Sequence, residues 1–301
     1  MSTGPAAGPS TTCGARNIYI DAGVNWCNTW QLFKQVPEAR SRAEQPWLVF
    51  GFEASPRIAP FAERCAQALS AGQPLPSPPI PPVGSTRELI KHAPKHNCSM
   101  SALGLRERSE HDRKVYRRHK LVPCMLRALE TPLASLTVDP RLFGNNSLLQ
   151  HRLALGRSGC MSGGSLRGSG AYTLLPAAVG HRDGQLTMND GPEAMITGGA
   201  THQATSKSRI ERYRVPQVDL SAWMARSFNE ADFVVLKLDV EGGEHHIIPK
   251  MIRDGTLRLV DAFLWECHHM PRSWHSPCHK LLKKLKEAGV QTVYEDPYSF
   301  L

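Results

Sequence analysis

The sequence predicts an α/β fold, in which a mostly parallel sheet carries helices on both faces. Two observations predict it: short apolar runs that end in acidic residues, and amphipathic stretches that alternate with these runs along the chain. A third is composition, because 301 residues with 41% hydrophobic side chains suffice for a sizeable core. No apolar run approaches the roughly 20 residues that span a bilayer, so no membrane segment is expected.

The first part of the chain supplies two expected strands and one helix. Residues 17–21 and 47–53 are short apolar runs that end in Asp21 and Glu53, a pattern typical of buried strands in parallel sheets. Residues 58–69 place their apolar side chains on one helical face.

The middle of the chain, residues 71–170, has little regular pattern. Residues 73–82 are proline-rich, and residues 87–120 are basic, with ten Lys or Arg against four acids. Residues 121–136 and 148–155 have weak helical character, and residues 156–170 are rich in Gly and Ser. A stretch of this length inside a compact domain predicts an insertion that is partly disordered. We therefore expect a disordered N-terminus at 1–16 and one domain at 17–301, interrupted at about 71–170.

Regular patterning returns at residue 172 and continues almost to the end of the chain. The expected strands are 172–179, 185–189, 215–220, 233–239, 259–265 and 290–294, and the expected helices are 221–227, 245–253 and 279–288. Asp183-Gly184 predicts a hairpin turn between the first two of these strands. Gly255 and Gly289 stand where they end the last two helices.

Acidic residues end three of the expected strands: Asp21, Glu53 and Asp239. In an open α/β sheet, ligands bind beyond these carboxyl ends, where an acid after the second strand accepts hydrogen bonds from ribose hydroxyls. Gly23 lets the backbone approach a ligand closely. The chain contains neither G-x-G-x-x-G nor a phosphate-binding P-loop, so the pattern favours a cofactor without a pyrophosphate that carries an adenosine and a cation. S-adenosylmethionine has both.

The segment Leu236-Lys-Leu-Asp-Val-Glu-Gly-Gly-Glu244 resembles the K-x-D-x-E-G-x-E signature of the FkbM methyltransferase family. Other segments are similar to family motifs in the same order: Asp21-Ala-Gly-Val-Asn25 to D-x-G-A-N, Phe52-Glu-Ala-Ser-Pro56 to E-P-x-P, Ala177-Ala-Val-Gly-His-Arg-Asp-Gly184 to A-V-G-D-x-D-G, and Val218-Asp-Leu220 to a threonine/leucine-Asp segment. The resemblance covers about 17–69 and 172–295.

The resemblance implies a Rossmann-like class I methyltransferase fold, with a sheet of the seven-stranded type and S-adenosylmethionine as cofactor. The implied reaction is O-methylation of a hydroxyl-bearing acceptor, a small molecule or a glycan. By resemblance, Asp21, Gly23 and Asn25 line the methionine part of the cofactor, Glu53 its ribose, and Ala178 its adenine.

The predicted catalytic residues follow two neighbouring strands. Asp239, and next to it Glu241, lie where a base or an acceptor-orienting group is needed. His268 follows the next strand and is a candidate for contact with the acceptor. Helix capping is the alternative role for Glu241 and Glu244, and also for Asp21.

Cysteine content adds further expectations. Cys27 stands where the family turn has a second glycine, so its Cβ is expected to crowd the methionine end of the cofactor. The eight cysteines are scattered and the N-terminus lacks a secretory signal, which predicts unpaired thiols in a reducing, cytoplasmic compartment. Six soft-metal ligands at 267–279 raise zinc as an alternative, but their spacing matches no zinc motif and no metal is expected.

Two other functions stay open at this stage. The net charge of +9 is concentrated in the basic stretch 87–120, which is suited to salt-dependent RNA or protein binding. Nucleic acid is the less favoured partner, because Tyr116 is the single aromatic residue there. A catalytically degenerate methyltransferase fold that acts as a binding scaffold is the second alternative.

Overall fold

A computed structural model gives the structure of the chain, and it describes residues 15–78, 93–99, 101–102, 120–121, 124–125, 128, 136, 138–144, 146–158, 171–190, 211–268, 277–290 and 292–295. The strands are β1 (Asn17–Ala22), β2 (Trp47–Phe52), β3 (Ala171–Leu175), β4 (Ala178–Gly180), β5 (Gly184–Asp190), β6 (Glu211–Asp219), β7 (Phe233–Leu238), β8 (Ala262–Trp265) and β9 (Thr292–Glu295). The α-helices are α1 (Ala59–Ser70), α5 (Pro140–Gly144), α6 (Asn146–Ser158), α8 (Leu220–Ser227), α9 (Glu244–Asp254) and α10 (Pro277–Glu287). Short 3₁₀ helices are η1 (Leu32–Gln35), η2 (Pro37–Arg42), η3 (Ala93–His96) and η5 (Thr256–Leu259).

Six parallel strands form the central sheet, in the order β3-β2-β1-β7-β8-β9. From β1 the chain builds outward in one direction through β2 and β3, and from β7 in the other direction through β8 and β9. The order therefore reverses between β1 and β7, which is the point where open α/β sheets bind ligands. The expected α/β fold is confirmed, with six strands in the described sheet instead of seven.

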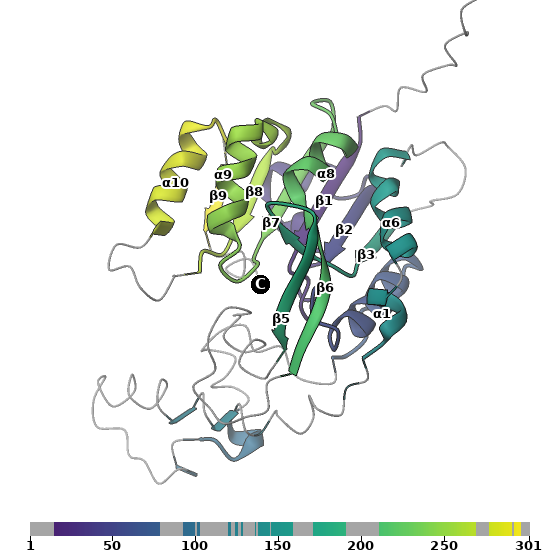
Figure 1. Ribbon diagram of the computed structural model, residues 1–301, viewed down its shortest axis with the longest axis vertical. Helices are drawn as coiled ribbons and strands as arrows, with labels where there is room; N and C mark the ends of the chain where they lie inside the picture. The colour runs from purple at the N-terminus through teal and green to yellow at the C-terminus, as the bar shows by residue number, and fades with distance from the viewer. Residues whose placement is uncertain are drawn as a thin grey trace, which may run out of the picture.

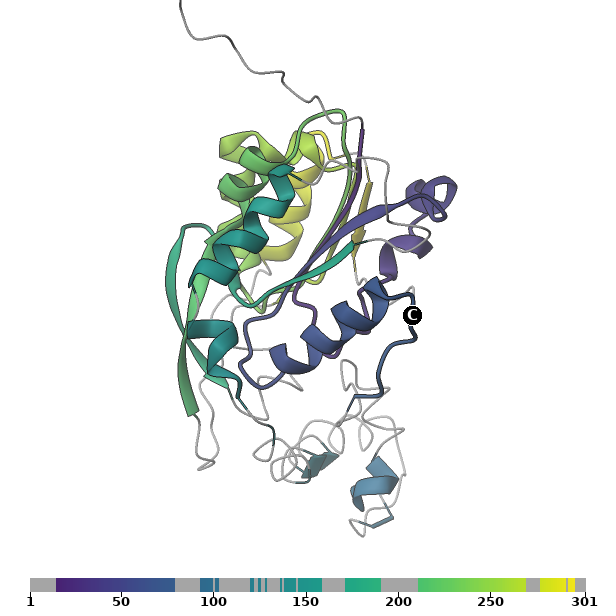
Figure 2. The same ribbon diagram turned by 90° about the vertical axis from the view of Figure 1, so that its right-hand side faces the viewer.

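Helices cover both faces of this sheet. Ile18 and Ile20 of β1 pack into one hydrophobic cluster with α6, α8, α9 and α10, while Tyr19 between them packs into the other cluster with α1. This alternation follows from the two-residue period of a strand. Figure 2 shows α1 on one side of the sheet and α6, α8, α9 and α10 opposite.

A smaller three-stranded sheet, β4-β6-β5, lies beside the central one (Figure 1). The single strand expected at 172–179 is wrong: it breaks at Pro176, which has no N–H to continue a ladder, into β3 and β4 of different sheets. The expected hairpin also differs, because β6 lies between β4 and β5 and pairs with both. The strand expected at 259–265 begins only at Ala262, after η5.

Part of the poorly patterned middle contacts the core. The helix expected at 148–155 is confirmed as α6, whose Leu149 is buried in the cluster under α8 and α9. Cys98 and Leu121 are buried in the opposite cluster, with α1. The basic stretch 87–120 and the helix expected at 121–136 lie mostly outside the described residues, as does the N-terminal segment 1–14.

The expectation of unpaired thiols is wrong for six cysteines. The structure pairs Cys27 with Cys65, Cys98 with Cys124, and Cys267 with Cys278. Scattered spacing hid these bridges, because partners 38 and 26 residues apart meet only through the tertiary fold. Within the described part of the chain, no helix has the length and apolar character needed to cross a membrane.

Candidate active site

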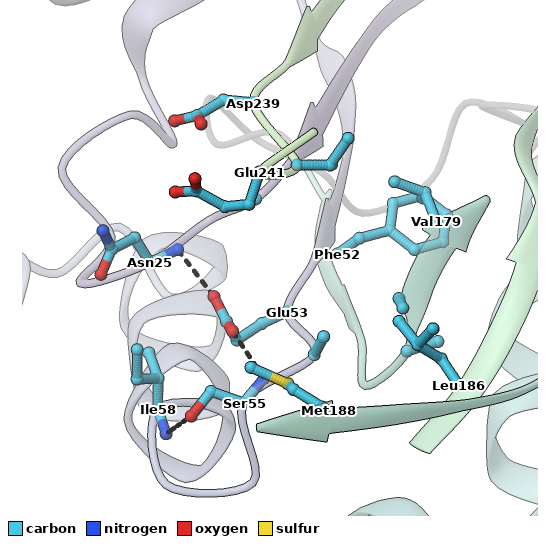
Figure 3. Close-up of a pocket in the computed structure, with 15 residues that line it drawn as sticks. Asn25, Phe52, Glu53, Ser55, Ile58, Val179, Leu186, Met188, Asp239 and Glu241 are labelled. Atoms are coloured by element: carbon cyan, nitrogen blue, oxygen red, sulfur yellow. Dashed lines mark hydrogen bonds between the residues drawn. The ribbon is translucent and has the colours of Figure 1, made fainter. Parts of the chain in front are cut away.

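A cavity opens at the reversal of strand order, beyond the carboxyl ends of β1, β2 and β7. Its lining residues come from both sheets: Gly23, Asn25, Phe52, Glu53, Ala54, Ser55, Ile58, Ala177, Ala178, Val179, Leu186, Met188, Asp239, Val240 and Glu241. Figure 3 shows the polar side chains of Asn25, Glu53, Asp239 and Glu241 on one side of the cavity. The other side is apolar and includes Phe52, Val179, Leu186 and Met188.

The turn after β1 must carry glycine at position 23. Gly23 has φ +99°, and a Cβ built there would lie 2.0 Å from the carbonyl oxygen of Asp239. Glycine at position 23 therefore allows the turn after β1 to lie close to the turn after β7, whereas the sequence interpretation had assigned it to the close approach of a ligand. The amide of Asp239 also donates to the carbonyl of Ala22, at 3.0 Å.

Glu53 braces the same turn. Its Oε2 accepts a hydrogen bond from the Asn25 amide at 2.8 Å, and its Oε1 accepts one from the Ser55 amide at 2.7 Å (Figure 3). Asn25 sits in the left-handed region at φ +52°, which asparagine tolerates better than most residues. Each carboxylate oxygen has more than one acceptor site, so Glu53 can also accept from a ligand hydroxyl.

A buried cation lies beneath the two turns. The Lys237 ammonium is fully buried, 3.2 Å from Asp21 Oδ1 and 3.4 Å from Asp239 Oδ2, and it donates to the Gly23 carbonyl at 2.7 Å. Burial disfavours the charged form of Lys237, but the two carboxylates outweigh it and raise its pKa. Thr29 donates to the other oxygen of Asp21, at 2.7 Å. Lys237 thus pairs with two carboxylates, those of Asp21 and Asp239.

Four carboxylates surround His268. Its Nε2 lies 2.9 Å from Glu241 Oε2 and 3.9 Å from oxygens of both Asp239 and Glu266, while its Nδ1 lies 3.1 Å from Glu244 Oε1. Burial opposes the charged imidazole, but hydrogen bonds to Glu241 and Glu244 outweigh it and raise the pKa of His268 to about 11. This shift favours the charged form of His268, whose two ring nitrogens face the carboxylates of Glu241 and Glu244.

Glu241 combines an unusual backbone with a shifted pKa. Its φ is +60°, in the left-handed region that side chains other than Gly and Asn rarely adopt. Burial is the largest influence and raises the pKa of Glu241 to about 8, with the carboxylates of Asp239 and Glu244 adding to it and His268 opposing it. A group with a pKa near neutrality is suited to proton transfer.

Cys27 does not crowd this cavity, contrary to expectation. Its φ is +70°, which explains why a glycine suits this position of the turn, and its side chain is buried in the disulfide with Cys65 of α1. The Cβ thus points into the core cluster beneath α1 instead of toward the methionine end.

The structure brings most of the predicted site residues together on the cavity wall, namely Gly23, Asn25, Glu53, Ala178, Asp239 and Glu241. Asp21 and His268 do not contribute to the wall that the described residues form: Asp21 lies beneath the turn, and His268 contacts Glu241. The sequence interpretation missed Leu186 and Met188 of β5. Their signal was the two-residue alternation of that strand, which puts both side chains on one face.

Two groups of described residues have metal-ligand chemistry. Cys267, Cys278 and His245 lie close together, but the two sulfurs form a disulfide and offer no thiolate, so among the described residues the zinc alternative lacks its cysteine ligands. Asp239, Glu266 and His268 bring three ligand atoms within 4.8 Å of one another. Carboxylate and imidazole ligands suit a divalent cation, although the close pairing of His268 with Glu241 accounts for this arrangement without one.

The parallel sheet, its reversal between β1 and β7, and an acid-lined cavity at that point define a Rossmann-like α/β protein with a cavity where open sheets of this kind bind ligands. Residues 162–291 match the family model of the methyltransferase FkbM domain, so the chain contains an FkbM domain and the expected resemblance is confirmed over this part. This family match supports the assignment of the chain as a methyltransferase. The similarity of residues 17–69 to the family lies outside the match. No match was found among curated proteins or among solved structures.

Proposed function

We propose that this chain is an S-adenosylmethionine-dependent O-methyltransferase acting on a hydroxyl-bearing small molecule or glycan. One observation carries the proposal: Glu53, which follows β2, and Asp239 and Glu241, which follow β7, converge on one cavity with an apolar opposite wall. A cofactor with an apolar adenine, a ribose and a sulfonium matches a cavity that has one acidic wall and one apolar wall.

The residues present fit such a cofactor. Ala178, Val179 and Leu186 offer an apolar surface to a base, and Glu53 has acceptor capacity for ribose hydroxyls. Asn25 Oδ1 is buried at the cavity and accepts no hydrogen bond from the described residues, so it is suited to a donor such as an ammonium group. Acidic side chains near the cavity also favour a cationic ligand.

When bound, S-adenosylmethionine supplies an electrophilic methyl group. The work of the chain is to hold the acceptor hydroxyl in line and to take its proton as the oxygen–methyl bond forms. We assign proton acceptance to Glu241, whose pKa of about 8 suits this role, and orientation of the acceptor to Asp239, which Lys237 holds in place. A positioned base contributes about 10²- to 10⁴-fold to such reactions.

Calorimetry with S-adenosylmethionine tests the cofactor assignment. Wild type should bind in the micromolar range, and Glu53→Gln should weaken binding at least tenfold. Glu287→Gln on the exposed side of α10 is the matched control and should bind like wild type. A folded wild type without affinity for the cofactor refutes the proposal and favours the scaffold alternative.

A labelled-methyl assay tests the acceptor class. Glycans and small alcohols should accept label from S-adenosylmethionine, and Glu241→Gln should lower the rate about 10²-fold with little change in cofactor affinity. If the label appears on a nitrogen atom of the acceptor instead of an oxygen atom, the assignment as an O-methyltransferase is wrong.

The compartment in which this reaction would occur is a separate question. The sequence interpretation expected a cytoplasmic location, whereas the three disulfides favour an oxidising compartment. Counting free thiols in protein extracted under acid quench decides between them: six oxidised cysteines in the native protein argue against the cytoplasm.

A further inference from the structure

Glu244 is an acid near the cavity that does not line the wall. It is the first residue of α9 and is fully buried. A carboxylate at this place is ordinarily explained by the positive end of the helix dipole. Its contacts, however, are directed backward, away from the helix.

Both oxygens of Glu244 bind the backbone of the preceding loop. Oε1 accepts from the Val240 amide and Oε2 from the Gly242 amide, each at 2.8 Å. Neither amide belongs to α9, so these bonds do not cap the helix but hold the loop that contains Glu241. Glu241 and Gly242 both have positive φ, +60° and +96°, a conformation that needs such support.

A third contact connects Glu244 to the next strand. His268, 24 residues further along the chain, places its Nδ1 3.1 Å from Glu244 Oε1 and its Nε2 2.9 Å from Glu241 Oε2. The imidazolium therefore bridges a carboxylate buried behind the loop and one on the cavity wall. A helix cap has no need of this bridge.

We propose that Glu244 is a positioning residue, which fixes loop 239–243 and, through His268, holds the carboxylate of Glu241 at the methyl-transfer site. The inference rests on the proposed function. Glu244 orients the imidazole, and the imidazole orients and charge-pairs with Glu241, in the way that buried carboxylates orient functional histidines elsewhere.

Glu244, His268 and Glu241 together form what we call the relay, and its charge state should affect cofactor binding. The sulfonium of S-adenosylmethionine favours an ionised Glu241, whereas S-adenosylhomocysteine has no such charge. The ratio of the two affinities should therefore rise in favour of S-adenosylmethionine as pH increases through about 8, where Glu241 loses its proton. Besides Glu241 and Glu244, the charged groups facing His268 are Asp239 and Glu266.

Two readouts on one variant test the relay. In Glu244→Gln, the pKa of His268 measured by NMR should fall by about 1–3 units, because an opposing charge is removed. The affinity ratio at pH 7 should fall by up to about tenfold, because an imidazolium that Glu244 no longer orients stabilises the ionised form of Glu241 less well, which lets the pKa of Glu241 rise by about one unit. Glu230→Gln removes an exposed acid paired with Arg258 and is the control that should change neither readout.

His268→Gln serves if Glu244→Gln does not fold, because it breaks the bridge while leaving the two bonds of Glu244 to the loop. It should also lower the affinity ratio at pH 7 about tenfold. A Glu244→Gln protein that is merely less stable, with an unchanged pKa of His268 and an unchanged ratio, overturns the inference. Loss of binding of both ligands by wild type instead refutes the proposed function, and the NMR titration still reports on the bridge.

Discussion

The disulfide between Cys27 and Cys65 connects the turn after β1 to α1, and its removal should lower the stability of the protein. The bridge closes a loop of 38 residues, for which the chain-entropy relation gives about 4 kcal/mol at 25 °C. The same relation gives about 3 kcal/mol for Cys267 and Cys278, which are 11 residues apart. Cys27→Ala keeps a Cβ at the same positive φ, so the backbone strain does not change.

Urea unfolding of Cys27→Ala, Cys65→Ala and the double variant measures this effect. Each single variant already lacks the bridge, so all three should lose about 4 kcal/mol, differing only by the small packing loss of a second sulfur. Cys27→Gly should recover about 1 kcal/mol, because glycine adopts φ +70° without strain. A loss below 1 kcal/mol in the single variants, or additive losses in the double variant, would refute the entropic argument. Binding of S-adenosylmethionine should weaken in the same variants.

Three further outcomes are expected. Lys237→Met should cost about 3–5 kcal/mol in urea unfolding, because it leaves Asp21 buried without its cation, and adding Asp21→Asn should recover part of that loss. Gly23→Ala should abolish S-adenosylmethionine binding in calorimetry or prevent folding, because the new Cβ has no space; binding like wild type would contradict the close approach of the two turns. Arg16→Met should cost about 3 kcal/mol or more, because Arg16 and Asp232 form a buried pair, but the folded variant should bind cofactor normally, since the pair lies away from the cavity.

The sequence predicted the parts of the fold in which local pattern and tertiary role agree. Strands β1, β2 and β7 are continuous apolar runs because both of their faces are buried, and the ends of α9 and α10 follow from glycines in the left-handed region. The convergence of Glu53 and Asp239 followed from the common edge of a parallel sheet.

Tertiary contacts that leave no local signal could not be predicted. Pro176 is a local signal for a break in the apolar run, but only the paired neighbours of β3 and β4 show that its two parts join different sheets. Asp21 has the motif position of a cofactor ligand, but the burial of Lys237 beside it turns it into an ion-pair partner. The same holds for Glu244, whose partner His268 is supplied by another strand.

The ammonium of Lys237 lies between the two turns that meet at the cavity, so one side chain ties together parts of the chain more than 200 residues apart in sequence. Neither turn can shift without disturbing the other, and a ligand therefore meets a receptor that is already pre-organised. Little conformational entropy is left to lose at this end of the site, which favours selection by shape over induced fit. Adaptation to new ligands is then expected to come from β4 and β5, which supply apolar side chains to the opposite wall.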